Sequence, residues 1–129
     1  MLEEAARLDP ALLSEAAEMS RRAGDLDRAL LLNSQVSDQK EKARQRLAIL
    51  VEMKRYEEAA AMEPRLSRLG LLEDEDVRYA LAYSYFMTRR FDPAREHLKK
   101  ITRADLFRSA AQLFKAMEVC EQDPLQCGF

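Results

Sequence analysis

A short pattern recurs three times along the chain and constrains the fold more than any other feature. Each copy holds a turn, a large apolar residue and, three residues later, an alanine. The large apolar residues are Leu26, Tyr56 and Phe91, and the alanines are Ala29, Ala59 and Ala94. The large apolar residues are 30 and 35 residues apart. A period in this range with two helices per unit predicts an all-α solenoid of antiparallel helix pairs, an architecture that binds other molecules more often than it transforms them.

The alanines have a physical role in such a fold. Two helices joined in a hairpin approach closely only where one side chain is short, so we expect Ala29, Ala59 and Ala94 at the crossings. The large apolar residues would then close the turn end of each hairpin.

The pattern resembles the tetratricopeptide repeat, a helix-turn-helix unit of about 34 residues. The third copy matches that family at Leu81, Ala82, Tyr85, Phe91, Ala94, Leu98 and Ile101. The second copy has Lys54 where the family prefers glycine, and the first has Ser20 and Asn33 where larger residues are usual. The resemblance implies a non-catalytic protein-binding scaffold, but the family serves many partners.

We expect one domain over residues 1–129, with helix pairs at 11–36, 39–69 and 76–102 and a further helix at 104–119. Pro64 removes a backbone donor, so the helix beginning near Glu57 either kinks or stops near Met62 and restarts. Residues 5–10 resemble the end of a second helix whose mate is missing, so we expect a segment of a longer repeat protein; the alternative is an ordinary N-terminal helical arm.

The helix over 77–88 carries two apolar stripes. Leu81, Ala82 and Tyr85 suit its own hairpin, which leaves a second stripe for a groove that binds a partner protein. That stripe consists of Tyr79, Tyr83, Phe86 and Met87. Residues at equivalent places in the earlier copies complete the candidate groove: Arg44, Ala48 and Glu52, and Glu18 and Arg21. The alternative is that the stripe packs under the next repeat, against Phe107 and Phe114.

The helix over 104–119 is expected to place Phe107, Ala110, Ala111, Phe114 and Met117 on one inward face. It either caps the third pair or begins another repeat.

Both cysteines of the chain, Cys120 and Cys127, flank Asp123-Pro124, a turn-forming pair. We expect a disulfide, and with it an oxidising compartment such as the bacterial periplasm. Two unrelated thiols remain the alternative, which fits a cytoplasmic protein. A metal site would need two further ligands.

No motif of an enzyme is found. Phosphate-binding glycine loops, zinc-protease motifs and nucleophile elbows are absent from the sequence, so we expect no enzymatic activity, no cofactor and no metal. The one histidine, His97, has no evident nucleophile nearby and is expected on an exposed helix face. The carboxylates of 73–76 stand where a helix begins and are expected to cap it.

Charge and hydropathy argue against nucleic acid and membrane. The formal net charge is −2, and the basic residues of 95–115 fall mostly on outward helix faces. No apolar run approaches the roughly 20 residues of a transmembrane helix, so we expect no insertion of this segment into a membrane.

The cysteine-flanked tail beside degenerate repeats is similar to the periplasmic repeat regions of bacterial exopolysaccharide-export proteins of the Pel type. That resemblance implies recruitment of a partner protein, such as a polymer-modifying enzyme, to an export or secretion assembly. A cytosolic secretion chaperone that cradles an extended partner segment is the first alternative. A structural spacer is the second.

The disulfide expectation has a direct test. Protein isolated from its native compartment without reductant and then alkylated should show no label on Cys120 or Cys127 by mass spectrometry, because both sulfurs are bonded. Reduction before alkylation is the control and should label both. Two labelled cysteines in the unreduced sample would contradict the exported setting.

Overall fold

The computed structural model describes residues 11–127, and its regular secondary structure in this range is helical. No strand occurs within this range, which confirms the prediction of an all-α fold. The helix end predicted at residues 5–10 lies outside the described residues.

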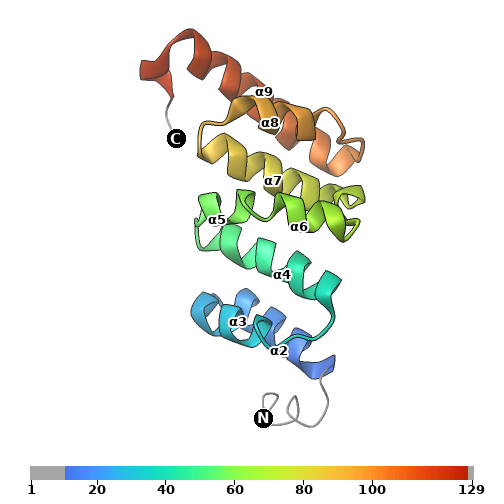
Figure 1. The fold of residues 1–129 in the computed structure, drawn as a ribbon. Coiled ribbons are helices and arrows are strands. Elements are labelled where there is room, and N and C mark those ends of the chain that lie inside the picture. Colours follow the sequence, from blue (N-terminus) through green and yellow to red (C-terminus); the bar gives the residue numbers. More distant parts are fainter. Residues whose placement is uncertain (1–10, 128–129) are drawn as a thin grey trace.

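The α-helices follow one another with short connections (Figure 1). They are α2 (Ala11–Arg22), α3 (Leu26–Asn33), α4 (Gln39–Glu52), α5 (Tyr56–Ala60), α6 (Glu63–Arg68), α7 (Glu75–Met87), α8 (Phe91–Leu98) and α9 (Ala104–Gln122). Two 3₁₀ turns, η1 (Leu71–Glu73) and η2 (Pro124–Gln126), precede α7 and follow α9.

The helix predicted to kink or stop near Pro64 stops. α5 ends at Ala60, and α6 begins at Glu63 with the proline in its first turn. Proline is tolerated there because the first amides of a helix have no partner within the helix. The break therefore places Pro64 at a helix position where a missing backbone donor costs little.

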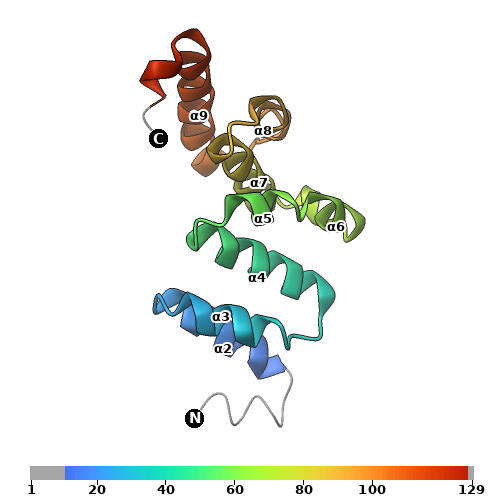
Figure 2. The same cartoon turned by 60° about the vertical axis from the view of Figure 1, so that its left-hand side comes forward.

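The helices stack in chain order into an elongated array. Each pair contacts the next through both of its helices: α4 lies against α2 and α3, α7 against α4 and α5, and α9 against α7 and α8. Figure 2 shows that the helix axes turn progressively, with α4 lying across the view and α9 nearly upright. This progressive rotation leaves the first helices of successive pairs side by side.

The three alanines are buried, as a close approach of the paired helices requires. Ala29, Ala59 and Ala94 are each 0% exposed. The core forms three clusters. Ala59 and Ala94 belong to two of them, and the largest packs α7, α8 and α9 together. The large apolar residues before the alanines, Leu26, Tyr56 and Phe91, are half-buried.

The same turn closes each first helix. Gly24, Lys54 and Arg89 have φ of 82°, 60° and 61° and stand two residues before Leu26, Tyr56 and Phe91. In each turn the amide of the left-handed residue donates to the carbonyl three positions earlier. The amide of the following residue donates to the carbonyl five positions before it. The pairs are Gly24–Arg21 and Asp25–Ser20, Lys54–Val51 and Arg55–Leu50, and Arg89–Phe86 and Arg90–Tyr85. This is the Schellman motif, which ends a helix with one left-handed residue.

A polar contact joins the first pair to the second. Asn33 is 0% exposed, and its Nδ2 donates to the Lys42 carbonyl at 3.0 Å and to Gln45 Oε1 at 3.1 Å. Gln45 Nε2 in turn donates to the Ser14 carbonyl at 2.9 Å. The Oδ1 atom of Asn33 has no hydrogen-bond partner among the described residues. The contact therefore includes a buried oxygen without a hydrogen bond, which is unfavourable. Among the described residues, no other buried side-chain atom of this kind lies between helix pairs.

The inward face of α9 differs from the prediction. Ala110 and Met117 are buried and Phe114 is half-buried, but Phe107 is 63% exposed and Ala111 is exposed. The buried stripe is instead Ala110, Leu113, Met117 and Cys120. At about 100° per residue, Phe107 lies roughly a quarter turn from the centre of this stripe.

Replacing Lys54 with glycine should stabilise the protein. Lys54 is exposed and holds a left-handed conformation that disfavours side chains with a Cβ, so Lys54→Gly should raise the free energy of unfolding by about 1 kcal/mol. Urea denaturation followed by circular dichroism measures this change. The matched control is Gly24→Ala, whose added Cβ meets nothing within 4 Å, so that only the φ of 82° opposes it. It should lose a similar amount, and a destabilised Lys54→Gly variant would refute the argument.

Candidate partner-binding face

The aromatic residues of α7 form a connected cluster with the turn residues of two hairpins. The Tyr83 ring lies 5.7 Å from Tyr56 in an edge-on arrangement, 6.5 Å from Tyr79 and 6.2 Å from Phe86. Phe86 continues the chain to Phe91 at 6.0 Å. The stripe predicted on α7 is therefore one physical unit that spans the second and third pairs.

Only part of this stripe reaches solvent. Tyr79, Tyr83 and Met87 are half-buried, as expected for a partly exposed face. The expectation that Phe86 is partly exposed is wrong: it is 5% exposed and belongs to the core cluster of α7, α8 and α9. Phe86 is covered because Phe91 and the apolar residues of α9 close over it, which no property of α7 alone reveals.

The charged residues predicted for the groove pair with one another. Arg21 of α2 forms ion pairs with Glu18 of the same helix and with Glu52 of α4. The hydrogen bond from Arg21 lowers the pKa of the Glu18 carboxyl. These three residues therefore fasten consecutive first helices to each other, so a partner that used them would have to break existing pairs.

Arg44 has the same function one pair further along. Its guanidinium pairs with Glu41 at 3.3 Å and with Asp74, ahead of α7, at 3.2 Å. Beside it, Ala48 and Leu47 line a hollow of about 90 Å³ together with residues of α7. This hollow is too small for more than one inserted side chain.

The carboxylates of 73–76 divide between two helix starts. Asp74 caps α7 by accepting the Asp76 amide at 2.9 Å, as predicted. Glu75 instead reaches the start of α9, where it accepts the Thr102 hydroxyl and amide at 2.6 Å each and the Arg103 amide at 2.9 Å. The hydroxyl bond, followed by the amide bonds, lowers the pKa of Glu75. The Glu75 carboxylate thus holds the residues at which α9 begins.

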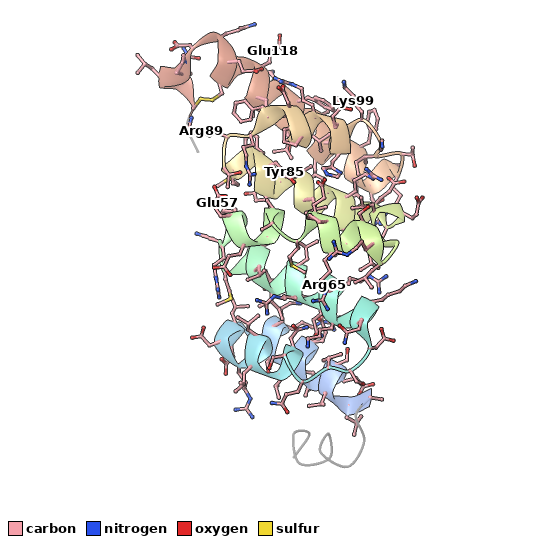
Figure 3. The ribbon with its side chains drawn as sticks, in the orientation of Figure 1. Glu57, Arg65, Tyr85, Arg89, Lys99 and Glu118 are labelled. Carbon is pink, nitrogen blue, oxygen red and sulfur yellow. A yellow bond between two sulfur atoms is a disulfide. The ribbon has the colours of Figure 1, made fainter. Side chains whose placement is uncertain are left out.

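His97 is not on an exposed face, which corrects the prediction from sequence. It is 7% exposed and stacks on the Tyr85 ring at 5.9 Å (Tyr85 is labelled in Figure 3). Its Nε2 pairs with Glu63 of α6, and Arg78 of α7 lies 3.2 Å from its Nδ1. A guanidinium only donates, so Nδ1 accepts and Nε2 carries the proton toward Glu63. The histidine therefore joins α6, α7 and α8 as a buried structural group.

The tyrosines beside these groups are harder to ionise than usual. Burial, followed by the neighbouring Glu63 carboxylate, raises the pKa of Tyr85 to about 12. Burial also raises the pKa of Tyr79 and of Tyr56. The shifts arise from packing, and they mark these rings as parts of the fold.

The two cysteines lie at disulfide-bonding distance, with Cα atoms 4.7 Å apart. The yellow bond in Figure 3 lies beside Arg89, whose NH1 is 3.6 Å from Cys120 Sγ. The cysteine loop therefore holds η2 against the end of α9, next to the turn between α7 and α8.

Phe107 is the candidate binding residue that sequence reasoning assigned to the core. It is 63% exposed on α9. Phe114, two turns further along α9, packs against the core cluster of α7, α8 and α9, as Tyr79 and Tyr83 do. The aromatic residues of α7 and α9 that reach solvent, Tyr79, Tyr83, Phe107 and Phe114, are together called here the aromatic face. Its signal in the sequence is the angular offset of Phe107 from the buried stripe of α9.

Other kinds of site find no support in the part of the chain that the structure describes. Within residues 11–127, no three His, Cys, Asp or Glu side chains gather in a way that could hold a metal ion. No helix in the same range combines the length and apolar character needed to cross a bilayer.

Alkaline titration tests the packing of Tyr85. Its pKa in the fold, about 12, exceeds its ordinary value near 10, so the unfolded chain loses this proton first. The stability it contributes is complete below about pH 10 and is lost as the pH rises toward 12. The free energy of unfolding should therefore fall less steeply over this window in Tyr85→Phe than in the wild type. Equal slopes in both proteins would contradict the assignment.

Comparison with known proteins adds no identity to this geometry: neither a family model, nor a curated protein, nor a solved structure matches the chain.

Proposed function

We propose that the chain is a solenoid of the tetratricopeptide type and a non-catalytic scaffold, and that its aromatic face binds a segment of another protein. The observation that carries the proposal is Phe107, a large aromatic side chain left 63% exposed on α9, while Tyr79 and Tyr83 are half-buried on α7. Aromatic side chains supply much of the energy of protein interfaces because they bury a large area with few rotatable bonds.

The paired charges of α2 and α4 support the same location. Glu18, Arg21 and Glu52 already satisfy one another, so they offer a partner little net energy. The aromatic face has no such internal competition at Phe107. We therefore place the anchor of the interface on α7 and α9, with an apolar segment of the partner across them.

The proposed setting is the periplasm, as part of a bacterial export or secretion assembly. The cysteine pair at disulfide-bonding distance supports an oxidising compartment. The partner class, a protein such as a polymer-modifying enzyme, rests on the resemblance of the cysteine-flanked tail to exopolysaccharide-export proteins.

A spacer function is the second candidate, and one observation favours it. Much of the aromatic stripe is engaged internally, with Phe86 buried and Tyr83 packed on Tyr56. In a spacer the stripe would only set the angle between pairs, and no partner would touch α9.

A photocrosslinking experiment separates binder from spacer. A photoreactive amino acid at Phe107 should capture one specific partner in the native cell, and Tyr83→Ala in the same chain should reduce the capture. The matched control is Leu31, which is equally exposed at 63% but lies on α3. Capture that is absent at both positions, or the same at both, would favour the spacer.

Substitution of Phe107 measures how much this side chain contributes to the free energy of binding. Once the partner is purified, Phe107→Ser should weaken binding by about 2 kcal/mol if the residue is a hot spot. Folding should change by less than about 0.5 kcal/mol because the side chain is largely in solvent. Tyr83→Ala should weaken binding too, but it should also destabilise the fold through the lost packing on Tyr56 and Phe86. Unchanged affinity for Phe107→Ser, measured by titration calorimetry, would remove the aromatic face as the site.

A further inference from the structure

A second recess lies between α4 and the broken helix α5–α6, and its lining is cationic. The pocket is about 200 Å³ in volume and is lined by Lys42, Ala43, Arg46, Ala61, Met62 and Arg65. Figure 3 labels Arg65 between the ribbons of α6 and α4. Half of the lining residues carry a positive charge and none carries a negative one.

The three cations of this pocket have no acidic partner among the described residues. Lys42 Nζ donates to the Ser34 carbonyl at 3.0 Å, and Arg65 NH2 donates to Gln39 Oε1 at 2.6 Å. Both acceptors are neutral. Arg46 is half-buried and forms no ion pair within residues 11–127. The charges therefore repel one another without an internal counter-ion.

The carboxylates of the same helices are engaged elsewhere. Each lies within ion-pair distance of a basic side chain that does not line the pocket. The pairs are Glu41–Arg44, Glu52–Arg21, Glu57–Arg90, Glu58–Arg55 and Glu63–His97. This arrangement leaves a recess whose charged lining residues are all cations.

The chemistry of the lining indicates the ligand. Guanidinium groups bind phosphate oxygens through two parallel hydrogen bonds, and a lysine adds a point charge. A doubly charged oxyanion would relieve the repulsion among the three cations in a partly desolvated space. Met62, Ala43 and Ala61 form an apolar wall that suits a hydrocarbon group attached to the phosphate.

We propose that the pocket between α4 and α5–α6 binds a dianionic phosphate group, either as a monoester on a small organic molecule or as free phosphate. The site is separate from the aromatic face. The pocket is lined by α4, α6 and the link between α5 and α6, whereas the aromatic face belongs to α7 and α9.

The proposal is tested by nuclear magnetic resonance on the 129-residue chain at constant ionic strength. Phenyl phosphate and inorganic phosphate are the probes, and benzoate is the monoanionic control. Saturable shifts of the Met62 methyl and the Arg46 Nε–H resonances are expected with the phosphates. Tighter binding of phenyl phosphate would identify a monoester as the ligand class, and equal binding would identify free phosphate.

Substitutions complete the test. Arg46→Gln should weaken phosphate binding by about tenfold, in line with the loss of one charge-assisted contact. Arg108→Gln, an exposed arginine on α9, should leave it unchanged. Arg65→Gln is the second variant in case Arg46→Gln does not fold. The proposal is overturned if the wild type shows no saturable shift at these resonances, if benzoate binds as well as the phosphates, or if the folded variants bind like the wild type.

Discussion

The close approach of paired helices at Ala29, Ala59 and Ala94 is the contact on which the rest of the structure depends. Each alanine is fully buried, and its short side chain allows the two helices of a pair to pack closely. A helix pair can reach this distance only if the chain reverses tightly, and the left-handed residue at Gly24, Lys54 or Arg89 provides the reversal. The left-handed turn residue and the buried alanine therefore work together in each of the three helix pairs.

The sequence predicted what depends on neighbours along the chain. The period of the turn, the buried alanines and the interruption at Pro64 follow from spacing and from the backbone chemistry of single residues. The burial of residues that contact other helix pairs does not follow from local spacing. Phe86 is covered by Phe91 and α9, and His97 is buried because Glu63, 34 positions away, meets it across the array.

The candidate sites show the same division. The aromatic stripe of α7 was visible as a second apolar face, but its exposed part could not be separated from its buried part without α9. The sequence suggests a core position for Phe107 because it falls within one turn of Ala110. In the structure the buried stripe of α9 is centred further around the helix, which leaves Phe107 exposed. The cationic pocket needs α4 and α6 together, and the helix break at Pro64 creates part of its wall.

Charge follows a consistent rule along the array. Where first helices lie side by side, opposite charges join them, as in Arg21–Glu52, Arg44–Asp74 and Asp76–Arg103. Exposed ion pairs of this kind contribute little stability individually, but they oppose sliding between neighbouring helices. Both proposed binding surfaces lie outside this pattern: the aromatic face on α7 and α9, and the recess whose charges are all positive.

The joint at Asn33 has a consequence for cooperativity. In an array where each pair contacts only its neighbours, unfolding divides at the weakest contact between units. Asn33 and Gln45 replace apolar packing there with a few hydrogen bonds and leave one oxygen unsatisfied. We therefore expect the first pair to separate from the array before α4 to α8 unfold, so that unfolding of the chain would not be a single cooperative step.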